Sequence, residues 1–478
     1  MLKSISLENY KCFEKLEDLE IKPLTILCGV NSSGKSSIIK SLLTLKQSYE
    51  NGSDYNSLIL NGQYTIDGTF NDVIRNHQGQ NFYLKNTFEI YNSNKLSGKE
   101  KHTIEQLKEI FPSISSAKKI FINVEINIKK KNIKKLNITD NLVDIYKVSV
   151  LQLNYDFSDI EYQITLNHIK DNFYNIEIKN FPNYNNVSLL NCACYFEGLK
   201  LINLYFEKTE PLNINIDKLL NNIFSIFRII PFQYHEIKYI APLRNEPVRT
   251  YLMQQDRNSV GLHGEYTPQI IADNIGKKIY TILPPKNDIL STSVHQEDFE
   301  TILNNWLNYL GIENVETILI SKSDSIKMNI GKDNFIDVGF GVSQVLPILV
   351  TGILMKKYES LVLQQPEIHL HPNMQMNFAD FLLSTAMKKK NIIIETHSDH
   401  IINRVARRIM EDKTGNLQNM VKIYFINKNN LDKPIENLTV DKVHGFVNAP
   451  DDFFSQFGSE SSKIFDAGIK NMPKLTIG

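Results

Sequence analysis

Residues 29–36 read Gly-Val-Asn-Ser-Ser-Gly-Lys-Ser and directly follow an apolar run at residues 24–28. Between a strand and a helix, the spacing G-x-x-x-x-G-K-S predicts a phosphate-binding loop, because its glycines let successive backbone N–H groups surround one anion. Lys35 would reach the β- and γ-phosphates of a nucleotide, and the Ser36 hydroxyl would ligate Mg²⁺. ATP and Mg²⁺ are therefore the predicted cofactors. The predicted contacts are Asn31, Ser32, Ser33, Gly34, Lys35, Ser36 and Ser37.

Two later apolar segments, Ser360–Gln364 and Asn391–Ser398, read as buried strands that end in polar side chains. Gln365 and Glu367 follow the first strand, and His397 lies at the end of the second. The segment between the strands is long enough for a helical crossover, which indicates a parallel sheet. NTPases keep their metal-binding and base carboxylates at the polar end of such a strand, whereas an isolated histidine at a strand end is usually structural. These polar residues are therefore candidates for metal binding and catalysis.

Two other segments carry polar groups whose role the sequence leaves open. Ile336–Pro347 contains two glycines and Ser343 just before an apolar helix predicted at Ile348–Met355, so its N–H groups and hydroxyl could hold an anion. A plain glycine-rich turn with an N-cap is the alternative. Arg244 and Arg249 lie in a proline-punctuated loop, where exposed salt-bridging arginines are the simpler interpretation.

The elements that would position these residues change in character along the chain. Strands are predicted at residues 2–8 and 19–28, and an apolar helix follows the phosphate loop. Short alternating segments such as 121–128 and 173–178, separated by Asn, Ser and Pro, indicate antiparallel strands in an inserted lobe. An amphipathic helix is predicted at residues 215–229.

The second half of the chain returns to buried strands and helices, including a helix at Phe299–Leu310 with Trp306 on its apolar side. Sustained heptads are missing, so a long coiled coil is excluded. The predicted fold class is α/β, with a mixed sheet and an inserted antiparallel β-rich and helical lobe. The predicted units are residues 1–75, 76–235, 236–440 and 441–478.

Composition restricts the possible partners and the compartment. Lys plus Arg and Asp plus Glu both number 53, so the net charge gives no general attraction to nucleic acid. The densest basic run, Lys129–Lys135, leaves two interpretations open. It is a local DNA contact, or it is a solvated strand end or hairpin, which is the simpler interpretation. No apolar run approaches the ~20 residues that cross a bilayer. The four cysteines form no zinc-type quartet, so we expect a cytoplasmic chain with reduced thiols and no membrane contact.

The order of these motifs resembles that of ABC-type ATPase heads. More closely, it resembles bacterial AAA-family, SMC-like ATPases related to the overcoming-lysogenisation-defect proteins and to ATPases of anti-phage defence operons. The matching segments are Asp337–Pro347, Gln365–Pro372 and Glu395–Arg404, and Asn448–Phe454 resembles a short C-terminal module of one subgroup. The resemblance covers roughly residues 1–75 and 236–457.

This resemblance implies a fold of the ABC/SMC head type and ATP hydrolysis. Gly341, Ser343 and Gln344 would contact the γ-phosphate of nucleotide bound to a second copy, and His397 would be a switch histidine. A head-to-head homodimer, or a larger oligomer, would then assemble around ATP and control a co-encoded effector, often a nuclease. Gln47, Arg244 and Arg249 are weaker assignments within the same scheme.

One departure from the family pattern affects catalysis. Gln364 stands where the Mg²⁺-associated acid is expected, and Gln365 stands at the position of the catalytic glutamate. In the subgroup that this chain most resembles, Glu-Gln-Pro-Glu is the expected run, so Gln364 is the departure and Gln365 is not. An amide neither holds Mg²⁺ with the same charge nor polarises water as a carboxylate does. Glu367 would be a substitute base. Hydrolysis would therefore be impaired more than binding, either because Gln364 is an engineered trap or because the native enzyme is slow.

Two other functions stay open as alternatives. A nuclease would need an appended acidic Toprim domain, but residues 428–478 are too few and only Asp441, Asp451 and Asp452 are scattered there. His369 and His371 suggest no third metal ligand, so packing and turn formation are the simpler roles. A DNA-tethering or repair ATPase is the other alternative, which the missing coiled-coil arms disfavour.

Overall fold

The computed structural model describes residues 1–51, 58–77, 79–90, 99–112, 117, 119–133, 138–153, 159–182, 184, 186–206, 215–254, 257–320, 324–427 and 434–450. The predictions about Asp451, Asp452, Lys134, Lys135 and most of the 441–478 unit lie outside this part of the chain. Its helices include none long and apolar enough to cross a membrane.

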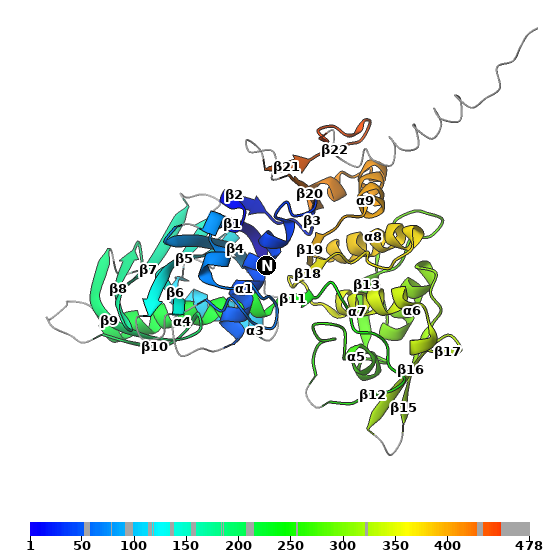
Figure 1. Cartoon of the computed structure of the whole chain (residues 1–478), viewed down its shortest axis with the longest axis horizontal. Helices are drawn as coiled ribbons and strands as arrows, with labels where there is room; N and C mark the ends of the chain where they lie inside the picture. Colours follow the sequence, from blue (N-terminus) through cyan, green and yellow to red (C-terminus); the bar gives the residue numbers. More distant parts are fainter. Residues whose placement is uncertain are drawn as a thin grey trace, which may run out of the picture.

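A six-stranded sheet stands at the centre of the molecule (Figure 1). Its first five strands are parallel and the last is antiparallel, so the sheet is mixed, as predicted. The strand order is β11 (Ile237–Ile240), β18 (Ser360–Gln364), β19 (Asn391–Glu395), β3 (Leu24–Gly29), β20 (Val421–Ile426) and β21 (Ile435–Leu438). Because β3 is a middle strand, the loop that follows it lies beside the ends of β19 and β20.

Apolar residues on both faces of this sheet divide the interior into two hydrophobic cores. Along β18, Val362 belongs to one core, whereas Leu361 and Leu363 belong to the other. Ile393 of β19 faces the same core as Val362, as the alternation of side chains along a strand requires. Strands buried on both faces read as continuous apolar runs, which is why these segments were recognisable in the sequence.

The helices on the two faces connect the parallel strands. They are α1 (Lys35–Glu50), α7 (Phe340–Leu354), α8 (Pro372–Ala386), α9 (Asp399–Glu411) and the short α10 (Asn416–Met420). Helix α7 begins eight residues earlier than the predicted Ile348–Met355 helix, because Gly339 serves as its N-cap and Pro347 is tolerated inside it. Residues 340–347 of the predicted glycine-rich loop therefore form the first two turns of a helix.

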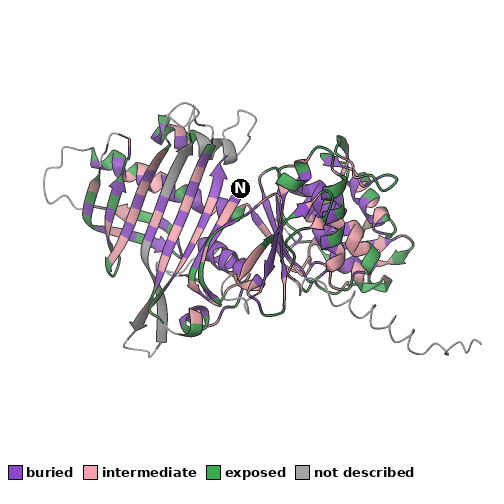
Figure 2. Cartoon of the chain, turned by 90° about the horizontal axis from the view of Figure 1, so that it is seen from above, coloured by how far each residue is buried: buried purple, intermediate pink, exposed green. Residues whose placement is uncertain are grey.

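A nine-stranded antiparallel sheet forms the large lobe that Figure 2 shows on the left. Its strands, in spatial order, are β10 (Lys200–Tyr205), β9 (Val187–Glu197), β8 (Phe173–Lys179), β7 (Ile160–Lys170), β6 (Ile138–Leu153), β5 (Lys119–Ile133), β4 (Asn81–Ile90), β1 (Leu2–Tyr10) and β2 (Phe13–Glu20). The predicted antiparallel lobe is present. Its sheet also includes β1 and β2 from the N-terminus, so it crosses the predicted boundary at residue 75.

One expected strand was wrong in its limits. The predicted strand at residues 19–28 covers the end of β2 and β3 up to its last residue but one, separated by Ile21–Pro23. Pro23 has no backbone N–H to give to a sheet ladder, so the chain leaves one sheet there and enters the other.

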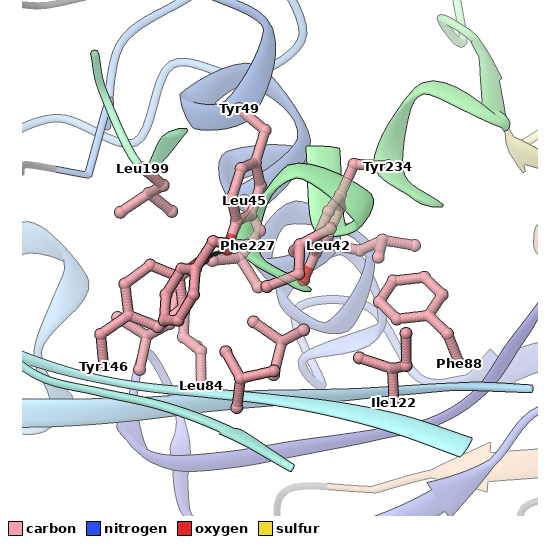
Figure 3. Packing of buried hydrophobic residues seen from close by; sticks show 14 of the residues in the cluster. Leu42, Leu45, Tyr49, Leu84, Phe88, Ile122, Tyr146, Leu199, Phe227 and Tyr234 are labelled. Carbon is pink, nitrogen blue, oxygen red and sulfur yellow. Dashed lines mark hydrogen bonds between the residues drawn. The ribbon is translucent and has the colours of Figure 1, made fainter. Parts of the chain in front are cut away.

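Helix α4 (Ile216–His235) covers the large sheet together with α1 and α3 (Lys99–Ile110). Figure 3 shows the contact, in which Tyr49 of α1 and Tyr234 of α4 lie over sheet residues such as Tyr146. The rings of Tyr49 and Tyr234 stack with centroids 4.6 Å apart. The helix that begins at the phosphate loop thus packs directly against the large lobe.

A third lobe surrounds α7 and contains a four-stranded sheet and a hairpin. Its helices are α5 (Thr267–Asp273) and α6 (Phe299–Tyr309). Helix α6 agrees with the predicted Phe299–Leu310 helix, and its Trp306 is buried. Its strands are β12 (Tyr251–Leu252), β13 (Lys278–Ile282), β14 (Val294–Asp298), β15 (Val315–Ile320), β16 (Ser325–Ile330) and β17 (Asp333–Asn334). The remaining short elements are α2 (Phe70–Val73), η1 (Arg75–His77), η3 (Phe335–Asp337), β22 (Val440–Asp441) and β23 (Gly445–Phe446).

Candidate nucleotide site

The phosphate loop connects β3 to α1 in a conformation that needs glycine at both ends. Gly29 has φ 129°, and a Cβ there would lie 2.2 Å from the carbonyl oxygen of Ile426. Gly34 has φ 110°, and its Cβ would lie 2.5 Å from Sγ of Cys12. Both positions combine a left-handed backbone with close approach of another group, which L-residues with side chains do not tolerate. The tertiary packing therefore explains the spacing of the two glycines.

Lys35 lies folded over the loop. Its Nζ donates to the backbone carbonyls of Gly29, at 3.0 Å, and Val30, at 2.7 Å. Burial lowers the pKa of this lysine, and the Glu395 carboxylate opposes that shift. A phosphate placed in the loop would exchange these neutral acceptors for charged ones, which form stronger hydrogen bonds.

A chain of hydrogen bonds connects three strand ends to the loop. The Ser36 hydroxyl donates to Oε1 of Glu395 at 2.5 Å. Nε2 of Gln364 donates to the other carboxylate oxygen, Oε2, at 2.7 Å. The Tyr239 hydroxyl donates to Oε1 of Gln364 at 2.6 Å. Gln364 is thus held between a phenol and a carboxylate, and Glu395 is the residue nearest to Ser36 that carries a negative charge.

The loop forms one wall of a cavity of about 820 Å³. All seven predicted loop contacts line it, as do Gln365 and His397 from the strand ends. The predicted phosphate-loop residues and two of the predicted catalytic residues are therefore brought together. Sequence reasoning did not assign the other lining residues, which are Lys11, Cys12, Asp72, Ile74, Asn76, His77 and Glu395.

Most of these additional residues had no signal in the sequence. Lys11 and Cys12 come from the β1–β2 turn, and Asn76 and His77 come from the segment after α2. Of these residues, only Glu395 lies in a segment that resembles the family, Glu395–Arg404. Its place on the strand next to Gln364 was not apparent from the sequence.

Glu367, the predicted substitute base, is not among the residues that line the cavity. Its Oε1 accepts the backbone N–H of His397 at 2.7 Å, and burial raises the pKa of its carboxyl. This contact fixes the turn that presents His397. Burial, followed by the charge of Lys35, lowers the pKa of His397. The geometry favours a positioning role for Glu367 over direct contact with nucleotide.

The predicted trans-acting residues lie elsewhere on the chain and do not line this cavity. Gly339 and Phe340 are exposed at the start of α7, whereas Ser343 is buried and its hydroxyl donates to the Phe340 carbonyl. Gln344 is fully buried, and its Nε2 lies 3.3 Å from Oγ of Ser343. In this conformation Gly339 and Phe340 are open to solvent, Gly341 is half-buried against the turn at His369, and Ser343 is buried.

The three weaker assignments have different environments. Gln47 is buried near the C-terminal end of α1, where its side-chain amide donates to the backbone carbonyls of Ile59 and Thr65. It is therefore remote from the cavity at the start of that helix. Arg249 forms an exposed bidentate ion pair with Asp337. Arg244 is buried beside Glu367, and burial lowers its pKa to about 10.

The two histidines of the His-Leu-His-Pro turn have packing and capping contacts. His371 is the N-cap of α8 and accepts the N–H of Asn373. The His369 ring packs edge-on against Phe340 at 4.8 Å, which connects this turn to the start of α7. The described residues contain no group of three His, Cys, Asp or Glu side chains arranged to hold a metal ion.

Comparison with known proteins gives one family match. Residues 1–402 match the family model described as the AAA ATPase domain. A search of curated proteins found no significant match.

Among solved structures, the SMC head domain from Thermotoga maritima is similar at 10% identity, covering 92% of this chain and 99% of its own, with a TM-score of 0.32. An SMC head bound to the C-terminal winged-helix domain of ScpA has 12% identity, coverage of 92% and 98%, and a TM-score of 0.36. An SMC head with an extended coiled coil, from Pyrococcus furiosus, has 10% identity, coverage of 98% of both chains, and a TM-score of 0.36. At these TM-scores the similarities carry no functional inference.

Proposed function

Since the chain belongs to the AAA ATPase domain family, we propose that it binds and hydrolyses Mg·ATP at sites completed by a second copy of itself. The family match identifies an ATPase domain. The dimer and its consequences are the proposal.

The position of α7 carries the proposal. One chain has a phosphate cavity lined by the loop, Gln365 and His397, and the exposed helix start at Gly339 and Phe340 is separate from it. A helix N-terminus binds anions through its free N–H groups and its dipole. A second copy that placed this helix start against the cavity would supply those N–H groups to the γ-phosphate. The backbone would act there, since the Ser343 hydroxyl is buried.

Within such a site, each residue has a role that follows from its contacts. The loop N–H groups and Lys35 would hold the β- and γ-phosphates, and the Ser36 hydroxyl would hold Mg²⁺. The ion, when bound, neutralises charge that develops on the transferred phosphoryl group. His397 and Gln365, at the edge of the cavity, would orient the attacking water. Glu367 would hold the backbone of His397 in place.

ATP-dependent assembly would then control a co-encoded effector, a nuclease, in cytoplasmic anti-phage defence. Support for this step comes from the resemblance of the motif segments to ATPases of defence operons. Nothing in the described residues adds support for an intrinsic nuclease or for a DNA-tethering role.

A mixing experiment tests the shared site. Lys35→Ala removes the phosphate lysine. Gly339→Glu places a negative charge at the start of α7, where a Cβ would meet nothing within 4 Å of its own chain. Each variant alone should be inactive. An equal mixture should regain roughly a quarter of the starting ATPase activity, because half of the dimers are mixed and each has one intact site.

If the Gly339→Glu variant hydrolyses ATP at the rate of the starting chain, the helix start is not part of the site. Capture of the mixture through an affinity tag carried by only one of the two variants checks that subunits exchange before the assay.

A further inference from the structure

Glu395 is a buried carboxylate at the phosphate loop, and the predicted catalytic scheme gave it no role. Only 4% of its surface is exposed, and both of its oxygens are directed at residues of the site. Ser36 and Gln364 occupy one oxygen each, at 2.5 and 2.7 Å. Ser36 and Glu395 are 359 positions apart in the chain, so only the strand order brings them together.

The register of the central sheet explains why Glu395 can act in place of the residue at position 364. Gln364 and Glu395 are direct partners in the β18–β19 ladder, and Glu395 is in turn paired with Leu27 of β3. Because β19 lies between β18 and β3, a carboxylate on β19 is one strand closer to the phosphate loop than a carboxylate on β18 would be.

The surroundings of Gln364 suit an amide. Its oxygen accepts from Tyr239 while its nitrogen donates to Glu395, and an amide does both without taking up a proton. A carboxylate at position 364 has no donor and would place a second negative charge against the first. Gln364 therefore fits the protein as the neutral partner of Glu395.

The Ser36 hydroxyl can serve Glu395 and a cation together. A hydroxyl has one proton to donate and two lone pairs, so donation to Glu395 leaves a lone pair for Mg²⁺. Mg²⁺ prefers oxygen ligands and is commonly held by one or two carboxylates together with substrate phosphates and water. Ser36, Glu395 and nucleotide phosphates make up such a set.

We propose that Glu395 supplies the carboxylate of the Mg²⁺ site in this chain, and that Gln364 is a positioning residue that holds it. This inference rests on the proposed binding of Mg·ATP. The sequence led to the expectation that Gln364 leaves the site without an acidic residue. In this proposal the acidic residue is Glu395, on the neighbouring strand β19.

The test measures how much Mg²⁺ strengthens nucleotide binding. The affinity for the non-hydrolysable analogue AMP-PNP is determined by calorimetry with Mg²⁺ and again with EDTA, and the ratio of the two affinities is the readout. The variants are Glu395→Gln, Gln364→Glu and the double exchange Gln364→Glu/Glu395→Gln. Glu359→Gln is the matched control, since Glu359 is another buried carboxylate, next to the opposite end of β18.

Glu395→Gln should lower the ratio by about tenfold or more, since loss of even a residue that only orients a metal ligand typically costs that much metal affinity, while binding in EDTA stays unchanged or tightens. Glu359→Gln should keep the starting ratio. Gln364→Glu should not accelerate ATP turnover. An unchanged ratio in Glu395→Gln, or faster turnover in Gln364→Glu, would overturn the proposal.

Thermal unfolding of each variant checks that it is folded. If Glu395→Gln does not fold, Glu395→Asp keeps the charge but shortens the reach to Ser36, and it should still lower the ratio. Failure of the proposed function has a different signature, because the starting chain would then bind AMP-PNP no better than Lys35→Ala. If the starting chain binds AMP-PNP and Glu395→Gln shows the same Mg²⁺ dependence, only the role of Glu395 is contradicted.

Discussion

Several charged side chains of this site are buried, and their contacts determine how the site is arranged. Glu395 has its oxygens satisfied by Ser36 and Gln364, and Glu367 accepts the N–H of His397. Arg244 is buried next to Glu367, and its Nε and Nη2 have no hydrogen-bond partner among the described residues. Buried polar groups without partners are costly and are concentrated at functional sites. The arrangement behind His397 is therefore one that nucleotide or a second subunit could complete.

Glu367 leads to a prediction about pH. Burial raises its folded-state pKa above the ordinary value, so below the ordinary range the carboxyl is protonated in both the folded and unfolded states. Above the raised pKa, the folded state alone bears the cost of a buried charge. We therefore expect Glu367→Gln to gain stability relative to the starting chain as pH rises from 4.5 to 8. Urea denaturation across that range measures the difference, and a difference independent of pH would contradict it.

At the scale of the elements, an ion-pair network fixes the helices that support β19. Asp380 of α8 is fully buried and accepts from Arg408 of α9 at 2.7 and 3.0 Å, and from the hydroxyl of Tyr309 of α6. Arg408 also reaches Asp288 in the segment between β13 and β14. Three helices and one loop are thus joined behind the strand that carries Glu395.

Removal of one partner should show how strongly this network holds. Arg408→Met removes two of the hydrogen bonds to the buried Asp380 carboxylate and leaves Arg404 and Tyr309 as its donors. The loss should therefore be smaller than the about 3–5 kcal/mol that follows when a buried charge keeps no partner. The double variant Asp380→Asn/Arg408→Met should lose less than the sum of the two single changes, because it removes both buried charges. Equilibrium denaturation of the three variants gives the coupling, and additive losses would contradict it.

At the scale of the molecule, helix α1, which follows the nucleotide loop, and the large antiparallel sheet share one hydrophobic core. That core includes Leu42 and Tyr49 of α1, Tyr234 of α4 and Tyr146 of the sheet (Figure 3). The predicted division at residue 75 passes between β1 and β4, which are paired strands. The contacts therefore favour a single cooperative unit over a separable inserted lobe, and the four-part division stays a prediction.

Scanning calorimetry tests this cooperativity. We expect the transition of the large lobe to coincide with that of the nucleotide site, and Mg·AMP-PNP to raise both together. Ligand at 100 times its Kd should add about 2.7 kcal/mol to the stability of every part that unfolds with the site. A separate transition that does not respond to nucleotide would show that the large lobe is an independent domain.

Local sequence was sufficient for several features because their causes are local. The spacing of Gly29, Gly34 and Lys35 determined the phosphate loop, and the apolar runs before Gln364 and His397 determined two parallel strands. Alternation in segments such as 173–178 revealed the antiparallel sheet. These patterns arise from the geometry of single strands, helices and turns, so they can be read without knowledge of the fold.

Contacts between distant segments were decided only by the tertiary structure. The strand order β18-β19-β3 places Glu395 against Ser36 and places the neutral side chain of Gln364 beside Glu395. The sequence showed only that position 364 lacks an acid, and it did not show that Glu395 lies next to it. Packing likewise buried Ser343 and Gln47, and pairing of β1 with β4 joined the N-terminus to the large sheet. The physical reason is that strand order and helix packing depend on the burial of apolar surface across the whole chain, so the neighbours of a side chain are not contained in its local sequence.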